Sequence, residues 1–149
     1  MKNPGETFFA LWKTYNFMPT DLLYVLDTHI LIWYFIGSRR LPQTTRLLID
    51  ETRQKGGRLL VPSIVLAEAL DIAEKGRVRF DFGAMFQLIQ NDPVFEIVGF
   101  GEEIFKETMD LKVVKEIHDR IIVATAHFYG AGILTKDRII RTSEEGAKK

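Results

Sequence analysis

Short apolar runs bounded by polar residues recur along the chain at spacings that suit buried strands. The first run, Leu22–Leu26, stops abruptly on Asp27. Apolar runs of this length fit the strands of a parallel sheet, because such strands are covered on both faces. Three further runs of the same kind, at 58–61, 95–99 and 133–135, predict a sheet of about four strands.

The segments between these runs have the patterns of helices. Gly37 and Gly130 follow two of them and are typical of residues that end a helix, and Ser63 is a suitable N-cap for a third. Strands that alternate with helices predict an α/β fold with a mostly parallel sheet built from right-handed crossovers. We expect helices at 30–36, 42–55, 63–75, 82–90, 101–109 and 117–129.

Chain length and composition favour a single folded domain. The 149 residues are 46% hydrophobic, which is enough for one core. We expect this domain to occupy residues 22–141 and the polar segment 142–149 to be a frayed tail. Residues 1–21 have two interpretations: an amphipathic helix that covers a sheet edge or a partner, or an upstream extension before a native start at Met18.

Charge and cysteine content narrow the functional classes only slightly. The 20 basic and 20 acidic residues balance, which argues mildly against nucleic-acid binding, although cations bound to carboxylates would add charge that the count omits. The absence of cysteine excludes disulfides and thiolate sites and suits a reducing cytoplasm. No apolar run approaches the roughly 18 residues that span a bilayer, so we expect no membrane association.

Two acids follow strands of the predicted sheet. Asp27 comes directly after the first strand and Asp137 comes shortly after the fourth. The carboxyl ends of parallel strands share one edge, where ligands gather in open α/β sheets. Each acid alone is explained as well by an N-cap role at the next helix; the pair together favours a site.

Glu68 is the only charged residue in the otherwise apolar segment 63–70. A carboxylate in these surroundings is predicted to be partly buried or to lie at the mouth of a cleft. Burial of a charge is costly unless the group is paired or binds a metal, so we expect a compensating partner. The alternative is a solvated stripe that Glu68 forms with Asp71.

Asp119 begins an apolar helical segment. It shares a helical face with Ile122, Val123 and Ala126, and this predicts that its side chain points inward. The alternatives are an N-cap role or an ion pair with a neighbouring cation, Arg120 or Lys115.

Four acids from four separate segments would repel one another without a cation. Mg²⁺ or Mn²⁺, which prefer oxygen ligands, would turn the cluster of Asp27, Glu68, Asp119 and Asp137 into a stable site. Phosphodiester hydrolysis is the chemistry that uses such a site.

Several segments resemble the PIN-domain nucleases, in particular the VapC-type toxins of toxin–antitoxin pairs. The segment 26–33 (LDTHILIW) is similar to L-D-T-H-x-L-L-W, and 62–68 (PSIVLAE) contains S-x-x-x-x-E. The following EKGRV at 74–78 resembles E-K-G-R-L. DRIIVATA at 119–126 is similar to D-R-x-I-V-A-T-A, and LTKD at 134–137 to L-x-T-x-D. Order and spacing hold across most of the chain.

The resemblance implies a three-layer α/β/α fold and a Mg²⁺- or Mn²⁺-dependent ribonuclease. Asp27, Glu68, Asp119 and Asp137 would be the catalytic and metal-binding acids, and Thr28 would help to hold the cluster. Such toxins are cytoplasmic, commonly form homodimers, and are inhibited by a cognate antitoxin protein. A solitary PIN nuclease, a non-cleaving PIN scaffold and an aspartyl phosphotransfer domain are the alternatives; the last is disfavoured because His29 replaces the second Asp that one such class requires.

Other residues have a role only by proximity to these acids. Glu116 stands before Asp119 where the subgroup often has D-P-x-D-R, so it is either an outer acid or a helix-start charge. No closing strand is evident after Asp137. We expect His29 and His118 to pack or support the site rather than bind a metal. Basic residues could bind RNA phosphates: Arg120, Lys136 and Arg138, with Arg141, Arg39 and Arg40 as further candidates.

Overall fold

A computed structural model describes residues 22–136 and 139–140. The predictions for 1–21, for the tail, and for the side chains of Asp137, Arg138 and Arg141 lie outside the described residues. The strands are β1 (Leu23–Leu26), β2 (Arg58–Pro62), β3 (Phe95–Val98), β4 (Gly132–Leu134) and β5 (Ile139–Ile140). The helices are α2 (Thr28–Ile36), α3 (Gln43–Gln54), α4 (Ser63–Glu74), α5 (Phe82–Asn91), α6 (Glu102–Asp110) and α7 (Ile117–Tyr129).

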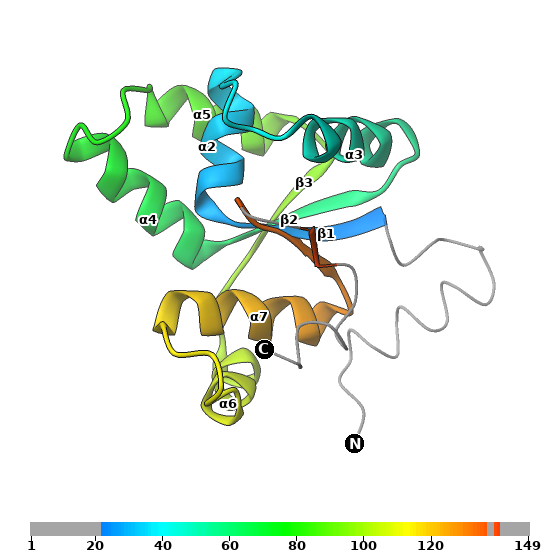
Figure 1. Ribbon diagram of the computed structural model, residues 1–149, viewed down its shortest axis with the longest axis vertical. Coiled ribbons are helices and arrows are strands. Elements are labelled where there is room, and N and C mark those ends of the chain that lie inside the picture. Colours follow the sequence, from blue (N-terminus) through cyan, green and yellow to red (C-terminus); the bar gives the residue numbers. More distant parts are fainter. Residues whose placement is uncertain (1–21, 137–138, 141–149) are drawn as a thin grey trace.

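The strands form one sheet in the order β3-β2-β1-β4-β5. The first four are parallel, and β5 pairs antiparallel with β4, with Leu134 opposite Ile139. Helices α2 to α5 lie over one face and α6 and α7 over the other (Figure 1). The predicted three-layer α/β/α fold with a mostly parallel sheet is therefore confirmed. The expectation that no strand follows β4 in the sheet was wrong, since β5 pairs with β4 and forms the edge of the sheet.

Strand β1 lies at the centre of the sheet because its residues tolerate burial on both faces. Tyr24, Val25 and Leu26 are all fully buried. The chain passes from β1 to β2 on one side, whereas β4 lies on the other. This reversal of direction leaves a crevice at the carboxyl ends of β1 and β4, the usual place for a ligand in such a sheet. Asp27 lies at that point, and its backbone N–H donates to Leu134 O at 3.0 Å.

Helix ends follow the predicted signals with one exception. Gly37, with φ of 65°, ends α2 and donates to Tyr34 O, a left-handed conformation that glycine adopts at little cost. Ser63 was predicted as the N-cap of α4 but is its first residue, and Pro62 is the N-cap. The reason is that Pro62 still pairs with Val98 in the sheet, so β2 runs directly into the helix.

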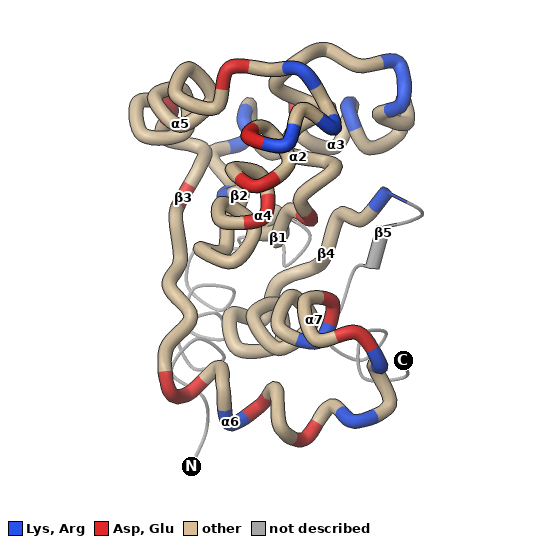
Figure 2. Tube along the Cα trace, turned by 90° about the vertical axis from the view of Figure 1, so that its left-hand side faces the viewer, with Lys and Arg blue, Asp and Glu red and all other residues tan. Residues whose placement is uncertain are grey.

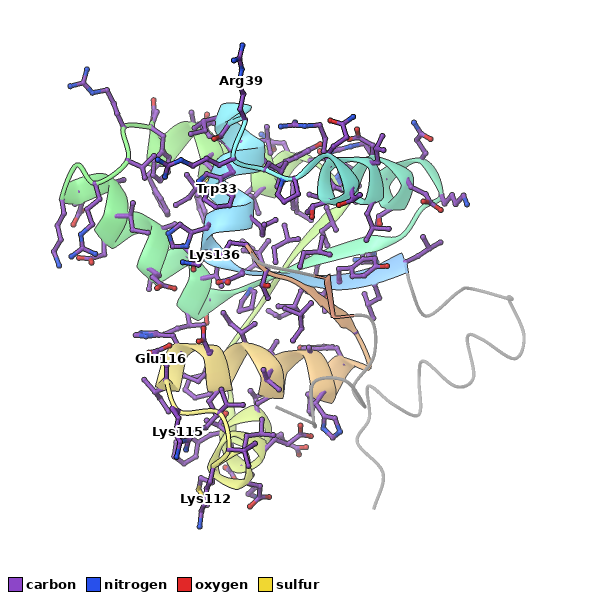
Figure 3. All side chains as sticks on the ribbon, viewed as in Figure 1. Trp33, Arg39, Lys112, Lys115, Glu116 and Lys136 are labelled. Carbon is purple, nitrogen blue, oxygen red and sulfur yellow. The ribbon has the colours of Figure 1, made fainter. Side chains whose placement is uncertain are left out.

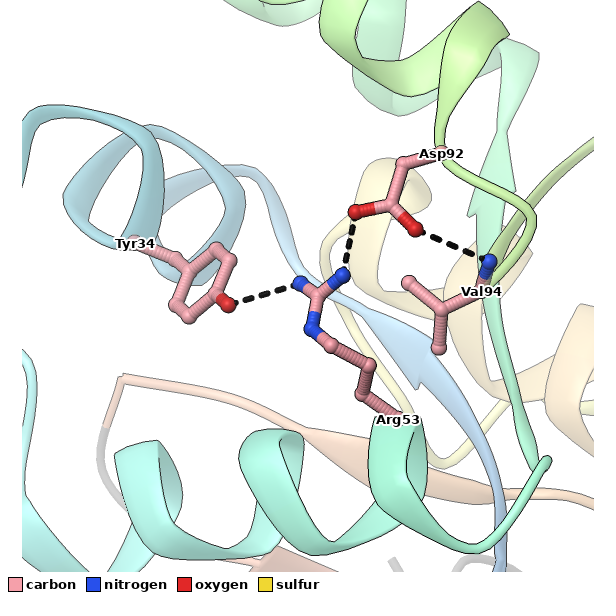
Figure 4. A network of polar contacts seen from close by, with 4 residues as sticks. All are labelled: Tyr34, Arg53, Asp92 and Val94. Atoms are coloured by element: carbon pink, nitrogen blue, oxygen red, sulfur yellow. Dashed lines mark hydrogen bonds and ion pairs between the residues drawn. The ribbon is translucent and has the colours of Figure 1, made fainter.

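A polar network fastens the helical layer over β2 and β3 (Figure 4). The Arg53 guanidinium on α3 forms an ion pair with Asp92, and its second terminal nitrogen donates to Tyr34 Oη at 2.7 Å. Asp92 also accepts from Val94 N at 3.2 Å. The network joins α2, α3 and the turn before β3. None of the described helices is long and apolar enough to cross a membrane.

Candidate active site

Asp27 occupies the junction between β1 and α2. It is the N-cap of α2, and its Oδ1 accepts from Thr28 N at 2.7 Å. The cap interpretation is therefore correct, but it does not remove Asp27 from the site. Its side chain is only half buried and interacts electrostatically with two further acids, Glu68 and Asp119.

Thr28 and Glu68 join α2 to α4 beside this junction. The Thr28 side chain is 1% exposed, and its hydroxyl donates to Glu68 Oε1 at 2.6 Å. Glu68 is half buried on α4. The prediction that Glu68 is partly buried and has a compensating partner is confirmed. The alternative, a solvated stripe with Asp71, does not describe Glu68, because Glu68 is half buried and bonded to Thr28.

Asp119 is the third residue of α7, and Glu116 is the N-cap of that helix. Glu116 Oε2 accepts from Asp119 N at 2.9 Å, and its other oxygen lies 2.9 Å from His118 Nδ1. Of the two roles predicted for Glu116, the structure shows the charge at the helix start. The N-cap role considered for Asp119 is wrong, because Glu116 occupies that position. Arg120 donates from Nε to Val114 O at 3.0 Å.

The orientation of Asp119 also differs from the prediction. Ile122, Val123 and Ala126 are buried as expected, but Asp119 itself is exposed. The first turn of α7 extends past the strand ends, so its side chains reach the solvent at the edge of the sheet rather than the core. Asp119 therefore borders the crevice from outside.

Neighbouring carboxylates disfavour the negative charge of Asp27 and of Asp119. Burial raises the pKa of Asp27, and the carboxylates of Asp119 and Glu68 raise it further, against the opposing hydrogen bond from Thr28 N. Partial burial, Glu116 and Glu68 raise the pKa of Asp119, and Lys136 opposes the shift. Figure 2 views this edge of the sheet and shows acidic positions on α4 and at the start of α7, on either side of the strand ends.

The donor chemistry of these side chains suits a hard divalent cation. Asp27, Glu68 and Asp119 offer carboxylate oxygens, which Mg²⁺ and Mn²⁺ prefer, and a cation would offset their repulsion. Within 22–136 and 139–140, no three His, Cys, Asp or Glu side chains are close enough together to hold a metal ion. The fourth predicted ligand, Asp137, lies outside the described residues.

A pocket of about 480 Å³ adjoins the acids. Residues of α4, including Ala67 and Glu68, line it, and so do His29 and His118. His29 packs against Trp33, with ring centroids 5.6 Å apart, and His118 contacts Glu116. His29 thus packs on a neighbouring ring, and His118 contacts the N-cap residue of α7.

The predicted basic residues are spread over different surfaces. Lys136 is exposed near Asp119, whereas Arg39 projects from the far end of α2, as Figure 3 shows. The prediction that Arg39 lies near the acids was wrong, because the full length of α2 separates them. Arg77, which lines the pocket, was missed although it belongs to the EKGRV segment that carries the resemblance.

Comparisons with known proteins bear on the same region. A family model described as the PIN domain matches residues 24–144. Comparison with curated proteins finds no match. Among solved structures, the chain is similar to one described as VapBC2 from Rickettsia felis bound to a DNA fragment from their promoter. The match has a TM-score of 0.60 and 18% identity and covers 76% of this chain and 86% of the other, and it supports the fold.

Proposed function

The chain belongs to the PIN-domain family, and we propose that it is a metal-dependent endoribonuclease, the toxin of a toxin–antitoxin pair. The observation that carries this proposal is that Asp27, Glu68 and Asp119 lie around the carboxyl edge of a parallel sheet, near enough to interact electrostatically although not to form a closed metal site by themselves. Each acid comes from a different element, and two have pKa values raised partly by the others. A PIN scaffold that does not cleave RNA would gain nothing from carboxylates that repel one another.

In the proposed site, Asp27, Glu68 and Asp119 hold Mg²⁺ or Mn²⁺ together with Asp137. When bound, the cation lowers the pKa of a water and offsets charge on the phosphodiester oxygens. Thr28 holds the Glu68 carboxylate through its 2.6 Å hydrogen bond. Glu116 holds the first turn of α7 and thereby the position of Asp119.

We propose that Lys136, and Arg138 beside it in sequence, bind phosphates of the RNA. Lys136 is exposed and its charge reaches Asp119, so it lies on the substrate side of the acids. Arg120 is less suited to this role. Its Nε already bonds to Val114 O, which favours a structural function in the segment that precedes α7.

The toxin assignment includes a cognate antitoxin as partner and a homodimer as the assembled form. It is supported by the fold similarity to a structure described as VapBC2 and by the motifs that resemble VapC-type toxins. Purification together with the product of a neighbouring small reading frame, followed by mass determination of the complex, tests the partner. A chain that remains active when co-expressed with that product would be a solitary PIN nuclease.

The proposed chemistry is tested by incubating purified protein with single-stranded RNA and Mg²⁺ or Mn²⁺. We expect cleavage that EDTA abolishes and that Asp27→Asn or Asp119→Asn reduces at least about 100-fold, as expected when a group essential to charge stabilisation is lost. Asp110→Asn, at an exposed position on α6, is the matched control. Circular dichroism verifies folding. Cleavage that persists in both variants or in EDTA contradicts the proposal.

A further inference from the structure

We propose that the pocket beside Glu68 is a subsite for one unpaired nucleotide next to the scissile bond, with Arg77 binding its phosphate. This inference rests on the proposed RNA cleavage. It assigns a substrate contact to a residue outside the acidic cluster and its supporting residues. The pocket opens between α4, the first turn of α2 and the first turn of α7.

The shape of the pocket suits an inserted base. Ile64, Glu68 and Ile72 lie on one face of α4 and line it, a stretch about 12 Å long at the rise of an α-helix. Val78 closes the end of this wall. The volume of about 480 Å³ lies within the usual range for pockets that bind small molecules. The apolar side chains can cover a base, whereas Glu68, midway along this wall, is the lining residue that also belongs to the proposed metal site.

Two imidazole rings, those of His29 and His118, also line the pocket, and both make contacts within the protein. His118 Nδ1 lies 2.9 Å from Glu116 Oε1, and the ring of His29 packs on Trp33. Proteins that recognise single-stranded RNA commonly stack unpaired bases on aromatic side chains, including His. The walls are therefore those of a base-binding site.

Arg77 supplies the charge that a phosphate requires. Its side chain is exposed and, among the residues that the structure describes, makes no hydrogen bond or ion pair. Asp71 also lines the pocket, and its carboxylate is paired with Lys75 at 3.1 Å rather than with Arg77. A guanidinium presents a planar fork of donors that matches a phosphate group. Arg77 is thus available to an anionic ligand.

The pocket adjoins the acids, and this indicates where an RNA strand would lie. Glu68 belongs both to the proposed metal site and to the pocket wall. A strand of RNA with its reacting phosphate at the acids would therefore place an adjoining nucleotide in the pocket. The phosphate on the far side of that nucleotide would meet Arg77, beyond the end of α4.

The test compares Arg77→Met with Arg79→Met, which removes an equal charge two residues away at an exposed position that does not line the pocket. With a short single-stranded RNA, we expect Arg77→Met to raise KM about 10-fold, as for a lost charge-assisted hydrogen bond, and to change kcat less than about twofold. The slope of log binding constant against log salt concentration should fall by about 0.7, the value for one phosphate on a single strand. Arg79→Met should change neither quantity.

A second pair of variants tests the pocket itself. Ala67→Phe would place a ring in the pocket and should raise KM about 10-fold or more, whereas Ala84→Phe, at an exposed position on α5, should not. If the wild type cleaves RNA but Arg77→Met and Ala67→Phe match their controls in KM and salt slope, the subsite is wrong and the proposed function stands. A fall in kcat with unchanged KM also contradicts it. If the wild type does not cleave RNA, both proposals fail.

Discussion

The Thr28 hydroxyl donates a 2.6 Å hydrogen bond to Glu68 Oε1 across 40 positions of sequence. The bond joins the first turn of α2 to α4, and Thr28 is almost fully buried. Glu68 is therefore positioned by a neighbour of another proposed metal ligand, Asp27. Two acids at the strand edge are held through adjacent residues of one short segment, and this segment is the junction between β1 and α2.

Thr28→Val tests this arrangement because valine keeps the shape and removes the donor. We expect the variant to lose about 1–3 kcal/mol in free energy of unfolding, as when a partly buried carboxylate loses its hydrogen-bond donor. The rate of RNA cleavage should fall as well, because Glu68 is no longer held. Urea denaturation and kcat measure the two effects. Thr28→Ser retains the hydroxyl and should restore most of both; equal losses in the two variants would show that the methyl group, not the hydrogen bond, matters.

Glu116 is predicted to act on catalysis through Asp119. Glu116→Ala removes the acceptor for Asp119 N and should cost about 1 kcal/mol, the usual effect of losing an N-cap. The first turn of α7 would loosen, so kcat should fall while binding of RNA changes little. Glu116→Gln retains an oxygen acceptor at the same reach and should preserve kcat better. A Gln variant as impaired as Ala would indicate instead that the charge of Glu116 is required.

The sequence predicted the fold well wherever a pattern was long enough. The bounds predicted for α7, 117–129, agree with the structure, because six successive buried residues and Gly130 mark the helix and its end. Strand β5 has only two residues, Ile139 and Ile140, too few for an alternation or a run to be recognised. Its pairing depends on β4, which no local pattern reveals.

The candidate site was predicted to the extent that it follows the strand ends. The rules of parallel sheets placed Asp27 at the carboxyl edge, whereas Glu68 was predicted from its apolar surroundings in 63–70, and only the fold brings the two together. The exposure of Asp119 could not be predicted from the sequence, because it depends on how far α7 extends past β1 and β4. Arg77 comes after the end of α4, where helical periodicity no longer applies. Only the tertiary structure places it in the same pocket as His29 and His118.

The raised pKa values predict how pH and metal affect stability. Asp27 and Asp119 have higher pKa values in the folded protein than the ordinary 3.8, so the folded state binds protons more readily than the unfolded chain. Their contribution to stability is therefore most favourable below about pH 3.8 and declines as the pH rises through their folded-state values. The repulsion between these carboxylates grows as the pH rises through those values, because both groups then lose their protons.

Two measurements at neutral pH follow from this repulsion. In EDTA, Asp27→Asn should have a higher Tm than the wild type, because it removes one charge and retains a side-chain acceptor for Thr28 N. Addition of Mg²⁺ should raise the Tm of the wild type, since a ligand that binds only the folded state stabilises it, and should raise that of Asp27→Asn less. Differential scanning calorimetry gives both values. A wild-type Tm that is unaffected by Mg²⁺ and Mn²⁺ would argue against a metal site at these acids.

Arg53 should matter for stability and not for catalysis. Its guanidinium pairs with Asp92 and donates to Tyr34 Oη, on the side of the helical layer away from the strand-end acids. Arg53→Met would leave the partly buried Asp92 carboxylate without its cation, and we expect a loss of about 1 kcal/mol, a value reduced for the solvent exposure of the pair. Lys106→Met, which breaks an exposed pair with Glu102, should change the free energy of unfolding by less than about 0.5 kcal/mol. Both variants should cleave RNA at the wild-type rate at temperatures well below their Tm, and a loss of kcat in folded Arg53→Met would mean that the far end of α2 is coupled to the acids at its start.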